Sequence, residues 1–245
     1  MYNSKFELSR QTLSAYSTAH PADPLANSLR AASYLFSELD RGGALMRGLL
    51  KDDHNIAKSK ADFDPAIGAA LNKAAAETRE QAGAILAKNS RDTNALLALC
   101  IVSGVQRDYL ALVQHKLRES YEYIKESQEY AARLLEVDPT AYDAYVTKGF
   151  TEYIVASLPF YLRWPMKLDN VSGTKQQGLD DLRIAAESGQ YLKPFAQLLL
   201  AMFYLREKQE PQTKRLLAQL AHDFPDNPVF ELELRKLGRP LLLRN

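Results

Sequence analysis

The stretch AARLLEVDPTAYDAYVTKGF, residues 131–150, contains the break that decides the fold. A run of good helix formers stops at Asp138-Pro139, a second helical pattern begins at once, and Gly149 lies inside that second pattern. Proline ends a helix. The stretch therefore predicts two helices joined by a short turn, with a glycine inside the second.

The rest of the chain has the same helical character. Glycine and proline occur only 11 times each among 245 residues, and Ala, Leu, Glu, Gln, Lys and Arg dominate. Asp64-Pro65 is typical of a helix start, and apolar residues then recur at three- and four-residue spacing to about Lys88. We expect an all-α fold.

Composition excludes several classes of function. Thirty-one basic and 30 acidic side chains give a net charge of +1, without the basic stripe expected of a nucleic-acid binder. Cys100 is the only cysteine, which excludes an internal disulfide and a multi-cysteine metal site. No apolar run reaches the length of a membrane span.

No catalytic, metal or cofactor motif stands out. The four histidines are far apart in the sequence, and SGTKQQG lacks the spacing of a phosphate-binding loop. Neither GxSxG nor HExxH occurs. We therefore expect no enzyme activity, no cofactor and no metal.

The break at Pro139 recurs along the chain. A small residue follows ten positions after each of four breaks, and Tyr191 and Pro225 are 34 residues apart. The four pairs are Pro21 with Ala31, Ser90 with Cys100, Pro139 with Gly149, and Tyr191 with Ala201. A fixed period of this length is the sign of a helical repeat.

This pattern resembles the tetratricopeptide repeat (TPR), a helix–turn–helix unit that stacks into a solenoid. In that family the small residue lets the two paired helices approach closely, so the resemblance implies that Gly149 lies at a contact between helices. The two stretches that match it best are Leu200-Ala201, Tyr204, Thr213, Leu217 and Pro225, and Phe6, Ser9, Leu13 and Pro21 running into Ala31 and Tyr34. The chain departs from the family pattern because every unit lacks the family's tryptophan, and Ser90 and Tyr191 stand where proline is expected.

The resemblance implies one domain over residues 1–245, an α-solenoid of stacked antiparallel helical hairpins. The hairpins would end near residues 21, 90, 139, 191 and 225, with insertions at about 42–63, 106–117 and 158–173. Residues 6–19 would be the second helix of a hairpin whose first helix is missing. We therefore expect further natural sequence upstream. The protein would be cytoplasmic as given, or periplasmic if a leader had been removed.

The resemblance also implies a non-catalytic role, because TPR units carry no catalytic residues and bind ligands in a concave groove. In this register the groove positions are largely apolar: Leu25, Leu97, Ile101, Val146, Phe150, Tyr153, Leu198 and Met202. Eight such side chains are not expected to face water. The sequence leaves three possibilities for what buries these side chains: the chain's own insertions, a protein or peptide partner, or an apolar small molecule or lipid.

The segment LPFYLRWP, residues 158–165, combines three aromatic rings, an arginine and two prolines. Aromatic residues and arginine are common at interface hot spots, but the same rings could pin a loop to the core. Our candidate binding residues are therefore Phe150, Tyr153, Met202, Tyr161, Arg163 and Trp164. The function we expect is a bacterial-type scaffold that binds a protein or peptide. The alternative is a binding protein for an apolar small molecule or lipid, such as an accessory component of a bacterial uptake system.

Overall fold

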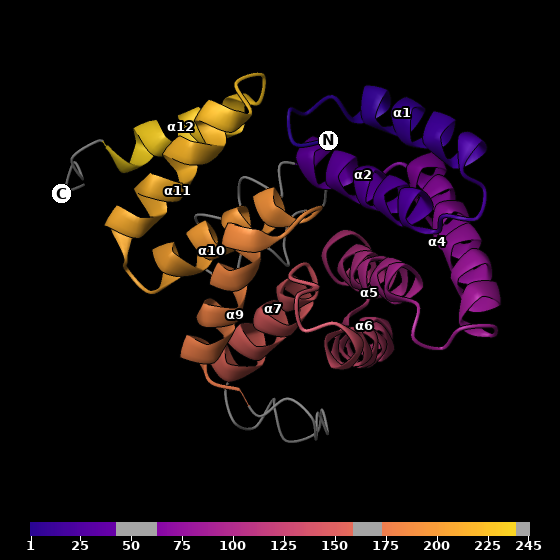
Figure 1. Ribbon diagram of the computed structural model, residues 1–245. Coiled ribbons are helices and arrows are strands. Elements are labelled where there is room, and N and C mark those ends of the chain that lie inside the picture. Colours follow the sequence, from indigo (N-terminus) through magenta and orange to yellow (C-terminus); the bar gives the residue numbers. More distant parts are fainter. Residues whose placement is uncertain (43–62, 159–172, 239–245) are drawn as a thin grey trace.

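The computed structural model describes residues 1–42, 63–158 and 173–238 (Figure 1). These residues form ten α-helices and a π-helical segment, and no β-strand occurs among them. The prediction of an all-α fold is confirmed. Most of the two expected insertions at 42–63 and 158–173 lies outside the described residues.

Short turns separate consecutive helices, except where residues 43–62 and 159–172, outside the described ranges, come between them. The helices are α1 (Phe6–Ala19), α2 (Leu25–Arg41), α4 (Pro65–Leu86), α5 (Thr93–Asp108), the π-helical η2 (Tyr109–Val113), α6 (Leu117–Val137), α7 (Ala144–Ser157), α9 (Lys175–Ser188), α10 (Lys193–Arg206), α11 (Glu210–Asp223) and α12 (Pro228–Leu237). Pro21, Ser90, Pro139, Tyr191 and Pro225 all lie in turns between helices.

Local sequence explains several helix ends. The Asp64 carboxylate accepts a hydrogen bond from the backbone N–H of Ala66, and Pro65 occupies the first turn of α4. At α9, Thr174 and Gln177 form a capping box, in which each side chain accepts from the other residue's backbone N–H. Asp138 follows α6 in an extended conformation, as expected before a proline.

Each described helix packs against the next one along the chain. In addition, α2 contacts α5, and α5 contacts α7. Figure 1 shows α2, α5, α7 and α10 toward the middle of the molecule, with α1, α4, α6, α9 and α11 outside them. We call the first set the inner helices. They contribute most of the buried residues, whereas α1 contributes none.

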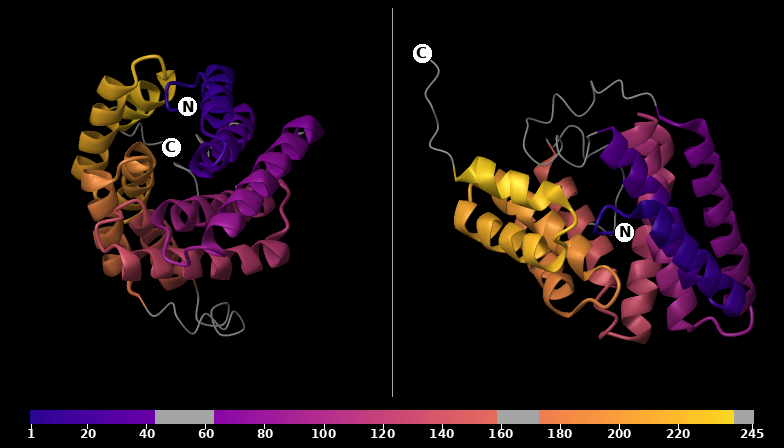
Figure 2. Two further views of the ribbon diagram at one scale, coloured as in Figure 1. Left: turned by 45° about the vertical axis from the view of Figure 1, so that its right-hand side comes forward. Right: turned by 90° about the horizontal axis from the view of Figure 1, so that it is seen from above.

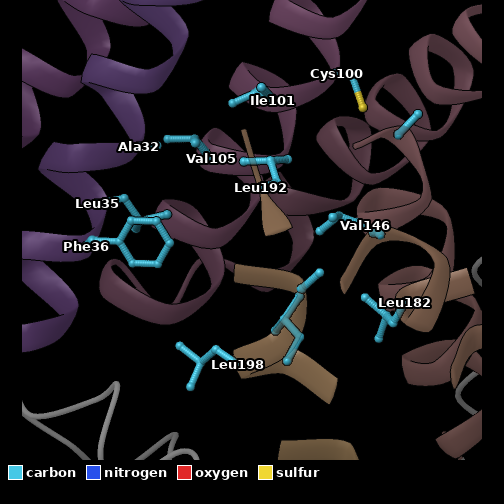
Figure 3. Packing of buried hydrophobic residues seen from close by; sticks show 14 of the residues in the cluster. Ala32, Leu35, Phe36, Cys100, Ile101, Val105, Val146, Leu182, Leu192 and Leu198 are labelled. Carbon is cyan, nitrogen blue, oxygen red and sulfur yellow. The ribbon is translucent and has the colours of Figure 1, made fainter. Parts of the chain in front are cut away.

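The array of helices curves round until its two ends meet. Figure 2 shows the first helices beside α11 and α12, and Lys5 forms an ion pair with Asp226, 221 residues away in sequence. Buried apolar side chains from α2, α5, α7, α9 and α10 pack together in one cluster (Figure 3). One continuous core therefore runs through the described residues.

The segment Thr93–Val113, which joins α5 and η2, is long and apolar enough to cross a membrane. Within the most apolar 18-residue window, 67% is buried inside the protein. Because α5 packs against α2, α4, α6 and α7, it has the surroundings of a core helix.

The close approach expected at Gly149 is confirmed. A Cβ atom on Gly149 would lie 2.6 Å from the carbonyl oxygen of Gly178 in α9 and 2.8 Å from the backbone nitrogen of Leu182. A Cβ atom on Gly178 would meet the Gly149 carbonyl oxygen at 2.7 Å. The backbones of α7 and α9 thus touch at two facing glycines.

Candidate functional site

The expected groove positions divide into two groups. Six are buried: Leu25, Leu97, Ile101, Val146, Tyr153 and Leu198. Phe150 and Met202 are only half-buried. Neighbouring inner helices supply much of the cover, as the packing of Phe36 and Leu35 near Leu198 shows (Figure 3). Of the eight positions, Phe150 and Met202 therefore keep the most surface for a ligand.

Aromatic rings from α7 and α10 form a continuous stack. The rings of Tyr153 and Phe203 lie 3.8 Å apart between centroids at an interplanar angle of 14°. The Phe150 ring lies 6.0 Å from Phe203 at an interplanar angle of 29°. We call Phe150, Tyr153 and Phe203 the inner aromatic row; Met202 precedes Phe203 in α10. Stacking of this kind adds to the stabilisation from burial and fixes the position of the half-buried Phe150 ring.

Arg107 closes one end of the inner aromatic row. Its guanidinium carbon lies 4.5 Å from the centroid of Phe150, within the range of a cation–π interaction. The Arg107 side chain pairs with the carboxylate of Asp108, its sequence neighbour, through Nε and Nη2. Only 7% of Arg107 is exposed, and its Nη1 has no hydrogen-bond acceptor among the described residues. The Nη1 atom has almost no exposed surface, so an acceptor oxygen would reach it only if the Arg107 side chain turned toward the exposed part of the Phe150 ring.

The other end of the row is polar and paired. The Tyr153 hydroxyl donates to Glu207 at 2.9 Å, and Glu207 also accepts from Lys175 at 2.8 Å. Burial, followed by the bond to Glu207, raises the pKa of Tyr153. The bond from Lys175 lowers the pKa of Glu207. This end of the row therefore holds α7, α9 and α10 together through groups that already have partners.

The predicted site residues have different outcomes. Phe150 and Tyr153 lie together in the inner aromatic row, and Met202 directly precedes Phe203 in α10. Tyr161, Arg163 and Trp164 lie outside the described residues. Sequence reasoning missed Phe203 and Arg107. The only signal for Arg107 was an arginine at the end of an otherwise apolar helix.

Cys100 has the environment of a structural thiol. It is 1% exposed, and its sulfur lies 3.2 Å from the Thr147 hydroxyl oxygen. Burial raises the pKa of the thiol to about 11, so the thiolate is scarce at neutral pH. Among the described residues, no group of three His, Cys, Asp or Glu side chains could hold a metal ion.

A second polar cluster joins α4, α5 and α6. Arg79 forms two 2.6 Å hydrogen bonds to the carboxylate of Glu126, which also accepts from Ser103 at 2.9 Å. Gln106 accepts from Arg79 at 2.7 Å and lines a 60 Å³ cavity beside η2. Each charge in the cluster has a partner, so its role is to fix the packing of three helices.

Comparison with known proteins leaves the chain without a family assignment. No protein-family model matches it, and no curated protein matches it either.

Proposed function

We propose that the chain is a TPR-like α-solenoid, a non-catalytic scaffold that binds a protein or peptide through its inner helices. Three observations support the proposal. Consecutive helices pack pairwise, short turns lie at the expected hairpin ends, and Gly149 makes the close helix contact that the repeat pattern requires. In this proposal the hairpins end near residues 21, 90, 139, 191 and 225 of a single domain.

One observation carries the proposed ligand class. The half-buried Phe150 ring lies under a guanidinium group whose Nη1 has no acceptor in the described part of the chain. A peptide offers an apolar side chain for Phe150 and Met202, and its carbonyl or carboxylate oxygens would accept from Arg107 Nη1 once that buried group turned toward the surface. A hydrocarbon ligand offers only the first of these.

The test is selection of a random phage-displayed peptide library on the immobilised protein, followed by fluorescence anisotropy with the selected peptides. We expect Phe150→Ala or Met202→Ala to weaken binding about tenfold or more, as at an interface hot spot. Leu117→Ala is the control, because Leu117 is 69% exposed on the outer helix α6.

Thermal unfolding of each variant separates lost binding from lost folding. Selected peptides whose affinity is unchanged by Phe150→Ala and Met202→Ala, in variants that remain folded, would overturn the proposal. Native mass spectrometry of protein purified without detergent tests the small-molecule alternative. An added mass on the order of a few hundred daltons, lost on denaturation, would replace the peptide by a small ligand.

A further inference from the structure

Residues 1–5 lie across the junction between the two ends of the helical array. We call them the N-terminal segment. They contact α2, α10 and the turn between α11 and α12, and they precede the first helix. Figure 2 shows the start of the chain beside the last helices. We call the surface beneath the segment the closure cleft; its main residues are Phe36, Leu198, Phe224, Asp226, Asn227 and Phe230.

The contacts are those of a short peptide in a binding site. The Tyr2 ring lies 5.4 Å from the Phe224 ring and 6.3 Å from the Phe36 ring. The Asn227 side-chain amide donates to the backbone carbonyl oxygen of Tyr2 at 2.9 Å. The Lys5 ammonium group pairs with Asp226 at 2.6 Å. One aromatic side chain, one backbone carbonyl and one cation are thus each recognised by a different group.

Asn3 adds a weaker polar contact. Its side-chain oxygen accepts from the backbone N–H of Asp226 at 3.3 Å. All these bonds come from the α11–α12 turn, where Asn227 also caps α12 by accepting from the N–H of Val229. The recognising groups are therefore held by a helix end and not by a loose chain.

The N-terminal segment fits this cleft imperfectly. The Tyr2 hydroxyl is buried and makes no hydrogen bond of normal geometry to a described residue, which carries a desolvation cost that the nearby Phe195 backbone N–H offsets only in part. Ser4 has φ = 56°, a left-handed conformation that a residue with a side chain adopts at a cost. A largely apolar cavity of 40 Å³ remains beneath Met1, Tyr2 and Ser4. A segment with an unpaired hydroxyl, a strained residue and empty space beneath it is replaceable.

The ion pair at the edge of the cleft is also weak. The side chains of Lys5 and Asp226 are 56% and 52% exposed, so water and salt screen the attraction between them. The N-terminal segment occupies the closure cleft mainly because it is part of the same chain, which gives it a high effective concentration there.

We propose that the closure cleft is a peptide-binding site, and that the N-terminal segment is an internal occupant that a partner peptide displaces. The partner carries a phenylalanine in the place of Tyr2, a glycine in the place of Ser4 and a lysine or arginine in the place of Lys5. Phenylalanine leaves no hydroxyl unpaired, and glycine adopts the left-handed conformation without strain. This site is separate from the inner aromatic row and does not depend on it.

The experiment uses the full-length chain and a peptide probe with the sequence Met-Phe-Asn-Gly-Lys and a C-terminal fluorescein. Tyr2→Ala removes the aromatic anchor of the internal occupant and leaves the cleft residues intact. We expect saturable binding to Tyr2→Ala in fluorescence anisotropy, and binding to the wild-type chain weaker by about tenfold or more because of competition in cis. Lys5→Ala, which loses only the exposed ion pair, is the milder second variant and should bind with intermediate affinity.

Three changes test the chemistry of recognition. A probe with tyrosine for phenylalanine should bind Tyr2→Ala roughly fivefold to tenfold more weakly, because its hydroxyl is again unpaired. In the Tyr2→Ala background, Asp226→Lys should weaken binding of the probe with lysine at its fifth position and strengthen binding of a probe with glutamate there. Phe150→Ala in the same background should leave probe affinity unchanged, which separates this site from the inner aromatic row.

Equal probe affinity for the wild type, Lys5→Ala and Tyr2→Ala would overturn the proposal, as would no binding to any of the three folded proteins. A wild-type dimer in native mass spectra that Tyr2→Ala abolishes would also overturn it. That result would make the occupant the same segment of a second copy.

Discussion

Replacement of Gly149 by alanine tests the contact between α7 and α9 most directly. The new Cβ atom would lie 2.6 Å from the Gly178 carbonyl oxygen and 2.8 Å from the Leu182 backbone nitrogen. Both are backbone atoms of α9, so no flexible side chain can move aside. The two helices must separate by several tenths of an ångström, which disturbs the packing along both.

Two opposing effects set the magnitude. Overpacking of a close contact costs about 1–3 kcal/mol, and rigid backbone neighbours favour the upper part of that range. Alanine in place of glycine within a helix gains about 0.5–1 kcal/mol. The net effect of Gly149→Ala is therefore a loss of about 2 kcal/mol, or roughly 4–8 °C in melting temperature for a chain of this size.

Gly83→Ala is the matched control. Gly83 also lies within a helix, α4, but a Cβ atom there would meet no other described atom within 4 Å. Only the gain of about 0.5–1 kcal/mol applies, so this variant should be slightly more stable than the wild type. If Gly149→Ala lowers the free energy of unfolding and Gly83→Ala raises it, the contact between α7 and α9 is the cause of the difference.

The assay is urea unfolding followed by circular dichroism at equal protein concentration, with thermal melts as a second measure. Gly149→Ala as stable as Gly83→Ala, with unchanged m-values, would refute the close approach of the two backbones. The double variant Gly149→Ala/Gly178→Ala should lose less than the sum of the two single losses, because one separation of the helices relieves both clashes.

Three further changes address other parts of the packing. Asp143→Asn should cost about 1.5–3 kcal/mol in urea unfolding, because the buried Asp143 carboxylate accepts from the backbone N–H groups of the 190–192 turn before α10. Glu126→Gln should lower the melting temperature at pH 7. Burial raises the pKa of Glu126, but the hydrogen bonds and the charge of Arg79 lower it more, so the pKa lies below its ordinary value. The carboxylate therefore stabilises the fold above its unfolded pKa of about 4.3. This stability is lost as pH falls through the folded pKa. The melting temperatures of the wild type and Glu126→Gln, measured at a series of pH values, should therefore converge at low pH. Ala201→Leu should cost about 1–3 kcal/mol in the same unfolding assay, because Ala201 is 1% exposed where α10 meets α11.

Local sequence signals predicted the helical class and several boundaries because the physics that sets them is local. Helix propensity, the Asp64-Pro65 start and the Pro139 break act within a few residues of chain. Gly149 was expected at a helix contact because of its place in the TPR-like pattern and not from local physics. Its partner was not, because a glycine in α9 gives no signal of which helix it faces.

The inner aromatic row was only partly predictable. In PFAQLLLAMFYL, residues 194–205, apolar residues occur on nearly every side of the helix, so periodicity does not separate Phe203 from Met202. The structure makes Phe203 the buried centre of the stack and leaves Met202 half-buried. Arg107 resembled any other surface cation, because its burial depends on Phe150 in a different helix.

Closure of the helical array was the feature least accessible from sequence, since it joins residues more than 220 positions apart. In an array whose helices contact only their chain neighbours, stability is a sum of local terms and the two ends are the weakest parts. A contact between the ends changes that balance. The outermost helix α1 has no buried residue of its own, yet the segment that precedes it is held by the α11–α12 turn. A peptide that displaced this segment would itself bridge α2 and the α11–α12 turn, but it would release the tether of α1, so occupation of the closure cleft would be coupled to the order of the first helix.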